Sequence, residues 1–192
     1  MQFKEANRRI DVMSTLAIVM IVKNEEESLA RCLKQAAGLA DKIYITDTGS
    51  TDRTREIAAA YGAVVTDYVW NQDFAAARNF ALSQSDCDWN LMLDADEYLA
   101  EGSRKDLEDF LKCPDKIGAI ELKNYYMEEM QGGKQEMAYT YLYVSRLLPG
   151  GVRFTGRIHE QVDSELPLVP VPLLFEHDGY LKQGKAERNL PI

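Results

Sequence analysis

The chain has 192 residues, 46% of them hydrophobic and 28% charged, which predicts a globular protein with a full core. Its formal net charge of −9 argues against binding to nucleic acid or to an anionic membrane, because both need a basic surface. Three cysteines without metal-ligand spacing indicate neither a zinc site nor a disulfide framework. We therefore expect a cytoplasmic protein without a transmembrane segment, with contact at the inner membrane face as an open alternative.

The first half of the chain alternates between apolar runs and amphipathic segments, after an N-terminal extension of residues 1–14. The predicted strands are residues 15–22, 43–46, 63–66 and 89–93, and the predicted helices are residues 25–38, 53–61 and 73–82. This alternation predicts a doubly wound α/β sheet. Ligands of such sheets bind at the carboxyl ends of the strands, so we expect Asn24, Asp47 and Asp94 on one rim.

The second half is predicted to extend the same domain, because no linker separates it from the first. Ser103 and Asp106 have the spacing of a capping box and predict a short helix that ends near Cys113. Residues 118–130 and 136–147 predict two strands joined by a turn at Gly132 and Gly133.

Two acidic motifs follow predicted strands. Asp94 and Asp96 come directly after a buried strand, an arrangement that suits a divalent cation with oxygen ligands. An isolated Asp-x-Asp also serves to solvate a strand end, so this motif is weak on its own. Asp47 leaves the second strand, where its carboxylate can bind a base or a ribose, and an ordinary turn is the alternative interpretation. Neither Gly-x-Gly-x-x-Gly nor Gly-Lys-Ser/Thr occurs, so the sequence lacks these phosphate-binding loops.

Taken in order, these segments resemble the family 2 glycosyltransferases with the GT-A fold. The resemblance rests on VKNEE at 22–26, DTGSTD at 47–52, FAAARN at 74–79 and LDADE at 93–97. The segments RL at 146–147 and FTGRIHEQV at 154–162 resemble a bacterial branch, which includes lipopolysaccharide-core sugar transferases and transferase domains followed by tetratricopeptide repeats.

The resemblance implies a mixed, mainly parallel GT-A sheet flanked by helices, with a β-rich extension on the acceptor side. Residues 15–192 would form a single domain, with a nucleotide-sugar-binding half at 15–100 and an acceptor-side half at 101–192. The chain stops close to where relatives of this branch continue into helical repeats, so we expect a truncation after residue 192.

The resemblance also implies a nucleotide-sugar donor, usually a UDP-sugar, and a Mg²⁺ or Mn²⁺ cofactor. The residues implied are Asn24 and Glu26 at the base, Asp47 at the base or ribose, Arg78 near the nucleotide, Asp94 at the ribose or metal, and Asp96 at the metal. His177 is a further candidate metal ligand, although a lone histidine is more often structural.

Family 2 enzymes typically invert the anomeric centre by a single displacement, which requires a carboxylate base. Glu160 is the favoured base and Glu97 its rival, and the alternative for Glu160 is a solvated or salt-bridged acid. The acceptor is expected to be a glycan, a lipid-linked molecule or a peptide, with a role in cell-envelope glycan synthesis. Tyr139, Tyr141 and Tyr143 alternate along one predicted strand, and packing over the sheet is favoured over an acceptor platform.

Two other function classes stay open. A haloacid-dehalogenase-like phosphohydrolase would also carry Asp-x-Asp after a strand, but its pattern has Thr or Val where Tyr98 stands here. A non-catalytic nucleotide-sugar-binding module is the second alternative.

Overall fold

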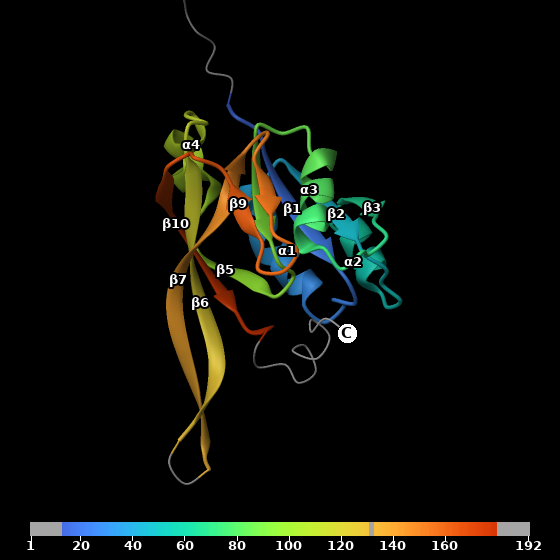
Figure 1. The fold of residues 1–192 in the computed structure, drawn as a ribbon, viewed down its shortest axis with the longest axis vertical. Helices are drawn as coiled ribbons and strands as arrows, with labels where there is room; N and C mark the ends of the chain where they lie inside the picture. The colour runs from blue at the N-terminus through green and yellow to red at the C-terminus, as the bar shows by residue number, and fades with distance from the viewer. Residues whose placement is uncertain (1–12, 131–132, 180–192) are drawn as a thin grey trace, which may run out of the picture.

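The computed structural model describes residues 13–130 and 133–179. The first half of the chain alternates strands and helices, as predicted from its apolar periodicity (Figure 1). Its elements are β1 Leu16–Val22, α1 Leu29–Ala36, the short 3-10 helix η1 Ala37–Leu39, β2 Lys42–Asp47, α2 Thr54–Ala60, β3 Val64–Asp67, α3 Phe74–Gln84 and β4 Trp89–Leu93. The sequence prediction of four strands linked by helices is therefore confirmed.

Parallel pairing aligns the ends of these strands on one edge. Strand β1 pairs with β2, so that Val22 lies opposite Asp47, and with β4, so that Met20 lies opposite Leu93. The segments that follow β1, β2 and β4 therefore leave the sheet at the same edge. This places Asn24, Asp47 and Asp94 on a common rim, as predicted.

The second half of the chain extends the same sheet through three antiparallel pairings and one parallel pairing, between β6 and β10. Its elements are β5 Glu97–Glu101, α4 Arg104–Leu111, β6 Ile117–Glu129, β7 Gln135–Pro149, β8 Arg153–Thr155, β9 Gln161–Asp163 and β10 Leu168–His177. The eight-stranded sheet has the order β3-β2-β1-β4-β7-β6-β10-β5, and β8 and β9 form a separate pair. Strands β6 and β7 were predicted, whereas β5, β8, β9 and β10 were not.

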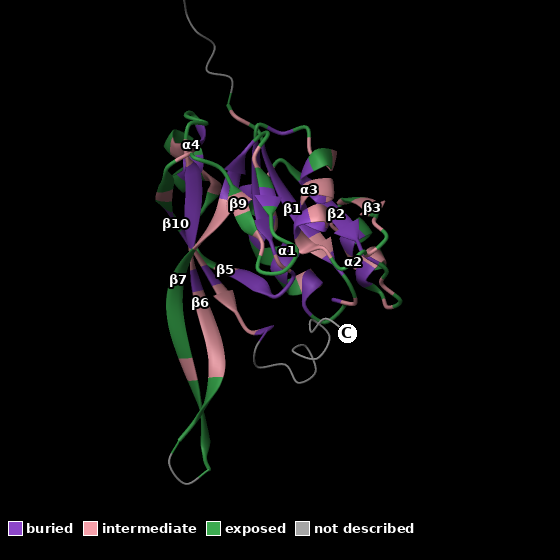
Figure 2. Cartoon of the chain, in the orientation of Figure 1, coloured by how far each residue is buried: buried purple, intermediate pink, exposed green. Residues whose placement is uncertain are grey.

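The core has two layers, one on each face of the sheet. Alternate residues of β1, from Leu16 to Val22, pack with buried side chains of α1, such as Leu33. The intervening residues Ala17 and Val19 pack with α3 and with Phe154 of β8. Helix α3 and the β8–β9 pair therefore cover the face opposite α1, and Figure 2 shows the strands between them as buried.

The β6–β7 hairpin extends beyond this core as a long arm, and its outer part is exposed or half-buried (Figures 1 and 2). Tyr139, Tyr141 and Tyr143 are 55%, 52% and 55% exposed. The prediction that these tyrosines mainly pack is therefore wrong, because the hairpin extends past the helices that would cover them. Gly133 has a positive φ of 74°, while Gly132 of the predicted turn lies outside the described residues.

Two predicted helix starts also differ from the structure. Helix α1 begins at Leu29 rather than at 25–27, and the acidic residues before it are held by the segment after β2: the backbone N–H of Glu25 binds the Thr54 hydroxyl and the N–H of Glu26 binds Asp52. The capping box before α4 does not form: the Ser103 hydroxyl donates to the Asp106 carboxylate at 2.6 Å instead of accepting from the backbone. Within the described residues, no helix is long and apolar enough to span a membrane.

Candidate active site

A tight turn presents the two aspartates at the end of β4. The Glu97 N–H donates to the Asp94 carbonyl at 3.1 Å, and the Asp94 N–H donates to Glu97 Oε2 at 3.0 Å. Ala95 is 5% exposed and Glu97 is 1% exposed, so the turn is fixed by packing as well as by hydrogen bonds. This geometry fixes where Asp94 and Asp96 lie on the rim.

Asp94 lies between two arginines from different elements. Arg78 Nη2 of α3 is 2.9 Å from Asp94 Oδ1, and Arg146 Nη2 of β7 is 2.7 Å from Asp94 Oδ2. Burial alone would raise the pKa of Asp94, but the charges of Arg146 and Arg78 hold that pKa well below its usual range. Asp94 is therefore a carboxylate whose two oxygens both face guanidinium groups.

Each of the two arginines also binds a second acidic side chain. Arg146 also binds Glu97 Oε1, and Arg78 Nε donates to Glu160 Oε1 at 2.7 Å. The five side chains contact one another in the order Glu160, Arg78, Asp94, Arg146 and Glu97, so that negatively and positively charged groups alternate. Burial raises the pKa of Glu97 more than the charge of Arg146 lowers it. Glu160, the favoured base, is thus the salt-bridged acid at the outer end of this network.

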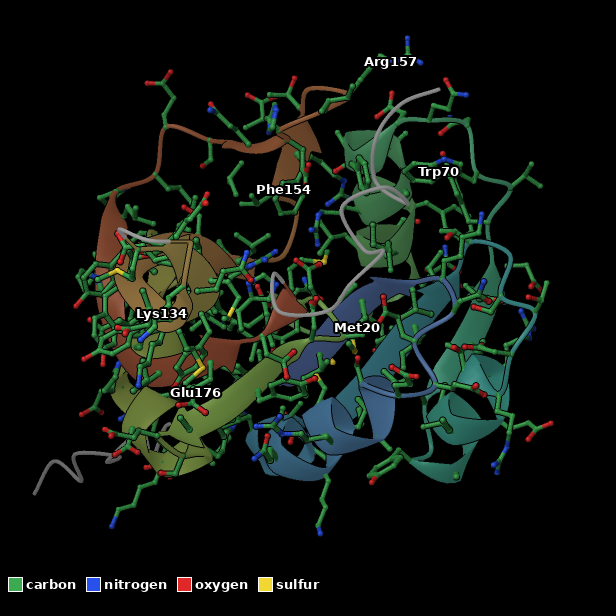
Figure 3. The ribbon with its side chains drawn as sticks, turned by 90° about the horizontal axis from the view of Figure 1, so that it is seen from below. Met20, Trp70, Lys134, Phe154, Arg157 and Glu176 are labelled. Atoms are coloured by element: carbon green, nitrogen blue, oxygen red, sulfur yellow. The ribbon has the colours of Figure 1, made fainter. Side chains whose placement is uncertain are left out.

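Helix α3 also fixes the loop that carries Glu160. The N–H of Phe74 donates to the Arg157 carbonyl at 3.0 Å, at the start of the helix. One turn further, the Asn79 side chain accepts from the N–H of Phe154 at 2.7 Å and donates to its carbonyl at 2.9 Å. Figure 3 shows Phe154 and Arg157 beside α3, on the side of the sheet away from Glu176. His159, in the same loop, is exposed.

Asp96 meets His177, which lies at the end of β10. His177 Nε2 is 3.3 Å from Asp96 Oδ2, and His177 Nδ1 is 2.8 Å from Asn124 Oδ1. Burial alone would lower the pKa of His177, but the hydrogen bond and the charge of Asp96 raise it above its ordinary value. A Cβ atom at Gly179 would clash with both Asp96 Oδ2 and His177 Nε2, so the glycine leaves room beside this pair.

The Asp96–His177 pair fits part of a divalent-cation site. One carboxylate oxygen and one imidazole nitrogen are both ligands of Mn²⁺, and carboxylates with substrate phosphates are the usual partners of Mg²⁺. Within the described ranges, no group of three or more His, Cys, Asp or Glu side chains is placed to hold a metal ion. A cation held by Asp96 and His177 would therefore need further ligands from a bound diphosphate or from water.

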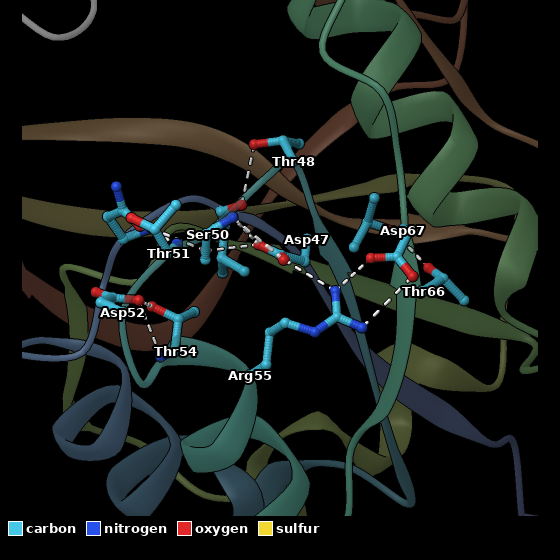
Figure 4. A network of polar contacts seen from close by, with 12 residues as sticks. Asp47, Thr48, Ser50, Thr51, Asp52, Thr54, Arg55, Thr66 and Asp67 are labelled. Carbon is cyan, nitrogen blue, oxygen red and sulfur yellow. Dashed lines mark hydrogen bonds and ion pairs between the residues drawn. The ribbon is translucent and has the colours of Figure 1, made fainter.

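Asp47 is 3% exposed and lies in a separate network (Figure 4). It accepts hydrogen bonds from the Ser50 N–H at 3.1 Å and from the Ser50 hydroxyl at 2.6 Å. Arg55 Nη1 is 2.9 Å from Asp47 Oδ2 and also binds Asp67 at the end of β3. Sequence reasoning missed Arg55, the second residue of α2, because no local pattern marks an arginine at a helix start as the partner of an acid at the end of the preceding strand.

Asn24 and Glu26, the two residues predicted at the base pocket, bridge neighbouring loops. Asn24 has a positive φ of 53°, and its Oδ1 accepts from the Thr51 N–H at 2.8 Å. Glu26 Oε2 accepts from the Arg53 N–H at 3.1 Å. The structure thus brings the segments after β1 and β2 together, next to Asp47 but apart from the network around Asp94.

The chain is similar to known proteins over most of its length. The sequence profile of glycosyl transferase family 2 matches residues 17–155. A TPR repeat-containing protein of Synechococcus elongatus is 37% identical over 195 residues, which cover 92% of this chain and 46% of that protein. The SPbeta prophage-derived glycosyltransferase SunS of Bacillus subtilis is 26% identical over 215 residues, which cover 98% of this chain and 50% of SunS. The chain therefore spans about half the length of these relatives.

Among solved structures, S. aureus TarS aligns with a TM-score of 0.50 at 23% identity, over 57% of this chain and 22% of TarS. At this level of identity the likeness concerns the fold alone. It agrees with the mixed, mainly parallel sheet described above and with the fold predicted from the sequence motifs.

Proposed function

The chain belongs to glycosyl transferase family 2 and has the GT-A fold, and from this premise we propose that it transfers a sugar from a UDP-sugar with inversion. Membership in this family sets aside the phosphohydrolase alternative. The proposal assigns the donor to the common rim of β1, β2 and β4, Mg²⁺ or Mn²⁺ to Asp96 and His177, and proton removal to Glu160.

The arrangement of arginines supports a diphosphate at this rim. Arg78 Nη1 and Arg146 Nε are buried and, within the part of the chain that is described, have no hydrogen-bond partner. Buried N–H groups of this kind are rare because each one costs free energy. Phosphate oxygens are strong acceptors for guanidinium groups, so a donor diphosphate would offer these atoms suitable partners.

Asp47, Asn24 and Glu26 are assigned to the nucleotide side of the rim. Asp47 is nearly fully buried and accepts hydrogen bonds from Ser50 and Arg55. We infer that it acts by holding the loop on which the base and ribose rest. Asn24 and Glu26 would hold the adjoining loop in the same way, because each binds a backbone N–H of the segment after β2.

Asp96 and His177 would hold the cation. When bound, Mg²⁺ or Mn²⁺ stabilises the negative charge on the departing diphosphate as a Lewis acid. The Asn124 carboxamide orients the His177 ring through Nδ1, which leaves Nε2 directed at Asp96. Asp94 contributes by fixing Arg78 and Arg146 rather than as a ligand, since both its oxygens face guanidinium groups.

Glu160 is assigned as the base and Glu97 as a structural acid. The acceptor oxygen attacks the anomeric carbon as the bond from that carbon to the diphosphate oxygen breaks, and the hydroxyl proton passes to Glu160. Arg78 binds Glu160 Oε1, so we assign Oε2 to the proton. Glu97 is 1% exposed and binds Arg146 and the Asp94 N–H, so it is poorly placed to reach an acceptor.

The observation that carries this proposal is the meeting of Asp96 and His177 beside the arginine network. Arg78 and Arg146 are already paired with Asp94, Glu97 and Glu160, so the net positive charge that a diphosphate needs would come from the cation held by Asp96 and His177, while the guanidinium groups would add N–H donors. Without that local charge, the formal charge of −9 would repel a UDP-sugar.

Replacing Glu160 tests the proposed base. Glu160→Gln is expected to lower the rate of UDP release from a UDP-sugar by roughly 10² to 10⁴-fold, because it removes the proton acceptor. The assay follows UDP release from UDP-glucose, UDP-galactose and UDP-N-acetylglucosamine in the presence of Mn²⁺. Glu165→Gln, at an exposed position nearby, is the matched control and should keep the normal rate. A normal rate for Glu160→Gln would remove Glu160 as the base, and no UDP release by the wild-type chain would favour a binding-only module.

A further inference from the structure

The end of strand β10 carries His177, which we assign to the proposed metal pair. In the pairing of β10 with β5, His177 lies opposite Glu97, and in the pairing with β6 it lies opposite Asn124. Both ladders end at this residue in the described chain, so Asp178 and Gly179 lie beyond the sheet. The positions of these two residues therefore depend on contacts other than strand pairing.

The segment beyond the ladders lies against the proposed metal pair. His177 Nε2 is 3.3 Å from Asp96 Oδ2, and a Cβ atom at Gly179 would clash with both of these atoms. The backbone of Gly179 thus occupies the space beside the pair. A shift of this segment would change the distance between the two ligand atoms and the room left for a cation.

The guanidinium group of Arg31, in helix α1, contacts this segment and the turn after β4 at the same time. Arg31 Nη1 lies 3.4 Å from Asp178 Oδ2. The same group lies 3.8 Å from the ring centroid of Tyr98, a residue that is 2% exposed and comes two positions after Asp96. An exposed ion pair alone contributes little, but stacking on a buried ring fixes the guanidinium group opposite Asp178. Arg31 therefore links the two segments that carry Asp96 and His177.

Arg31 makes this link from the face of the sheet opposite to His177. Side chains alternate along a strand, so Glu176 and His177 point to opposite faces of β10. Arg31, Glu176 and Asp178 line one shallow pocket of about 230 Å³. The guanidinium group is therefore placed to hold the chain and not to contact a cation between Asp96 and His177.

Glu176, on the other side of His177 in the chain, is held in a different way. The Tyr125 hydroxyl donates to Glu176 Oε1 at 2.6 Å, but Glu176 is also paired with Tyr98 on β5 and with Lys123 on β6. Strand pairing holds this residue on both sides whether or not the Tyr125 hydroxyl is present. Tyr125 therefore offers a control for a contact on the same face that does not determine the path of the chain.

We propose that Arg31 is a positioning residue for the metal pair, because it holds the end of β10 against the turn after β4. The inference rests on the proposed function, since it takes Asp96 and His177 as the ligands of the cation. Loss of a group that orients metal ligands typically lowers metal affinity by roughly 10- to 100-fold. The sign of the effect is diagnostic: removal of a positive charge would by itself strengthen the binding of a cation, whereas loss of the ligand geometry weakens it.

The experiment measures the affinity of the full chain for UDP by isothermal titration calorimetry at a series of Mn²⁺ concentrations. The readout is the Mn²⁺ concentration that gives half of the metal-dependent gain in affinity. Arg31→Gln should raise this concentration about tenfold and leave the affinity measured without Mn²⁺ unchanged. Asp178→Asn should have the same effect, and the double variant should be no worse than either single variant, because both changes remove one contact.

Two control variants should keep the wild-type Mn²⁺ concentration. Lys34→Gln removes an exposed positive charge from the same helix, away from the metal pair. Tyr125→Phe removes the hydroxyl that binds Glu176 and leaves the strand pairing of β10 in place.

An unchanged or lower Mn²⁺ concentration for Arg31→Gln would overturn the inference, and so would an equal rise in either control. A loss of UDP affinity without Mn²⁺ would show a general effect on the donor site, and additive effects in the double variant would show that Arg31 does not act through Asp178; both results also refute it. A wild-type chain whose UDP affinity does not depend on Mn²⁺ refutes the metal assignment of the proposed function as well. A metal-dependent wild type with a normal Arg31→Gln refutes this inference alone.

Discussion

Asp94 lies at the centre of the charge network, and its role follows from the groups that it contacts. Its two carboxylate oxygens face Arg78 and Arg146, and its backbone N–H binds Glu97. A carboxylate in this position fixes two guanidinium groups and the turn that presents Asp96. From these contacts we infer that Asp94, which the sequence motif suggests as a metal ligand, acts by holding the two arginines and the turn in place.

Arg146 is expected to be a major contributor to the stability of the fold. Arg146→Met leaves Glu97 buried without its partner, and breaking a buried ion pair from one side costs about 3 kcal/mol or more. Urea unfolding followed by circular dichroism would measure this loss of unfolding free energy. Arg153→Met removes an exposed arginine and should change the free energy by less than about 0.5 kcal/mol. A loss below about 1 kcal/mol for Arg146→Met would contradict the structural role given to this pair.

Local sequence motifs predicted some of the individual residues at the candidate site. Asp47, Asp94 and Asp96 could be placed on the rim because each follows a strand of a parallel sheet. Arg146 and Arg55 received no role from sequence reasoning, because an arginine at the end of a strand or in a helix gives no local sign of the acid it will meet. The pairing of His177 with Asp96 depends on the path of β10, which the sequence did not reveal.

Among the elements, the regular βα units were predictable and the later strands were not. Strands β1, β2 and β4 are continuous apolar runs with helices between them, and periodicity is a local property. Strand β10 contains Pro170 and Pro172, residues that normally argue against a strand, and its register shifts at this point. Strand β5 begins with Glu97, whose burial depends on a partner from β7.

Packing between β6 and β7 leaves no room for a side chain at Gly118. A Cβ atom there would lie 2.7 Å from Leu147 Cβ, next to the point where the register of the two strands shifts. Gly118→Ala is therefore expected to lower the free energy of unfolding by about 1–3 kcal/mol. Gly38→Ala is the control, since no atom lies within 4 Å of its Cβ position, and it should be neutral or slightly stabilising. Thermal unfolding gives the melting temperatures of both variants. Equal melting temperatures would contradict this prediction, because they would mean that β6 and β7 can move apart at Gly118 without loss of stability.

For the molecule as a whole, one sheet joins both halves of the chain at the rim. Strand β7 pairs with β4, and β10 lies between β6 and β5, so that the last described strand carries His177 back to the turn after β4. The proposed metal pair is therefore assembled only when both halves are folded. The same topology places the exposed arm on one side of the rim and α3 with the β8–β9 pair on the other (Figure 1).

Metal-dependent binding of UDP tests the central claim most directly. The melting temperature of the full chain is measured with UDP, with and without Mn²⁺, for the wild type, Asp96→Asn and the exposed control Asp115→Asn. At about 100 times the dissociation constant, UDP should stabilise the wild type and Asp115→Asn by roughly 2.7 kcal/mol with Mn²⁺. Asp96→Asn should lose the part of this shift that depends on the metal. A UDP-induced shift that is the same with and without Mn²⁺, or the absence of any shift, would contradict the account.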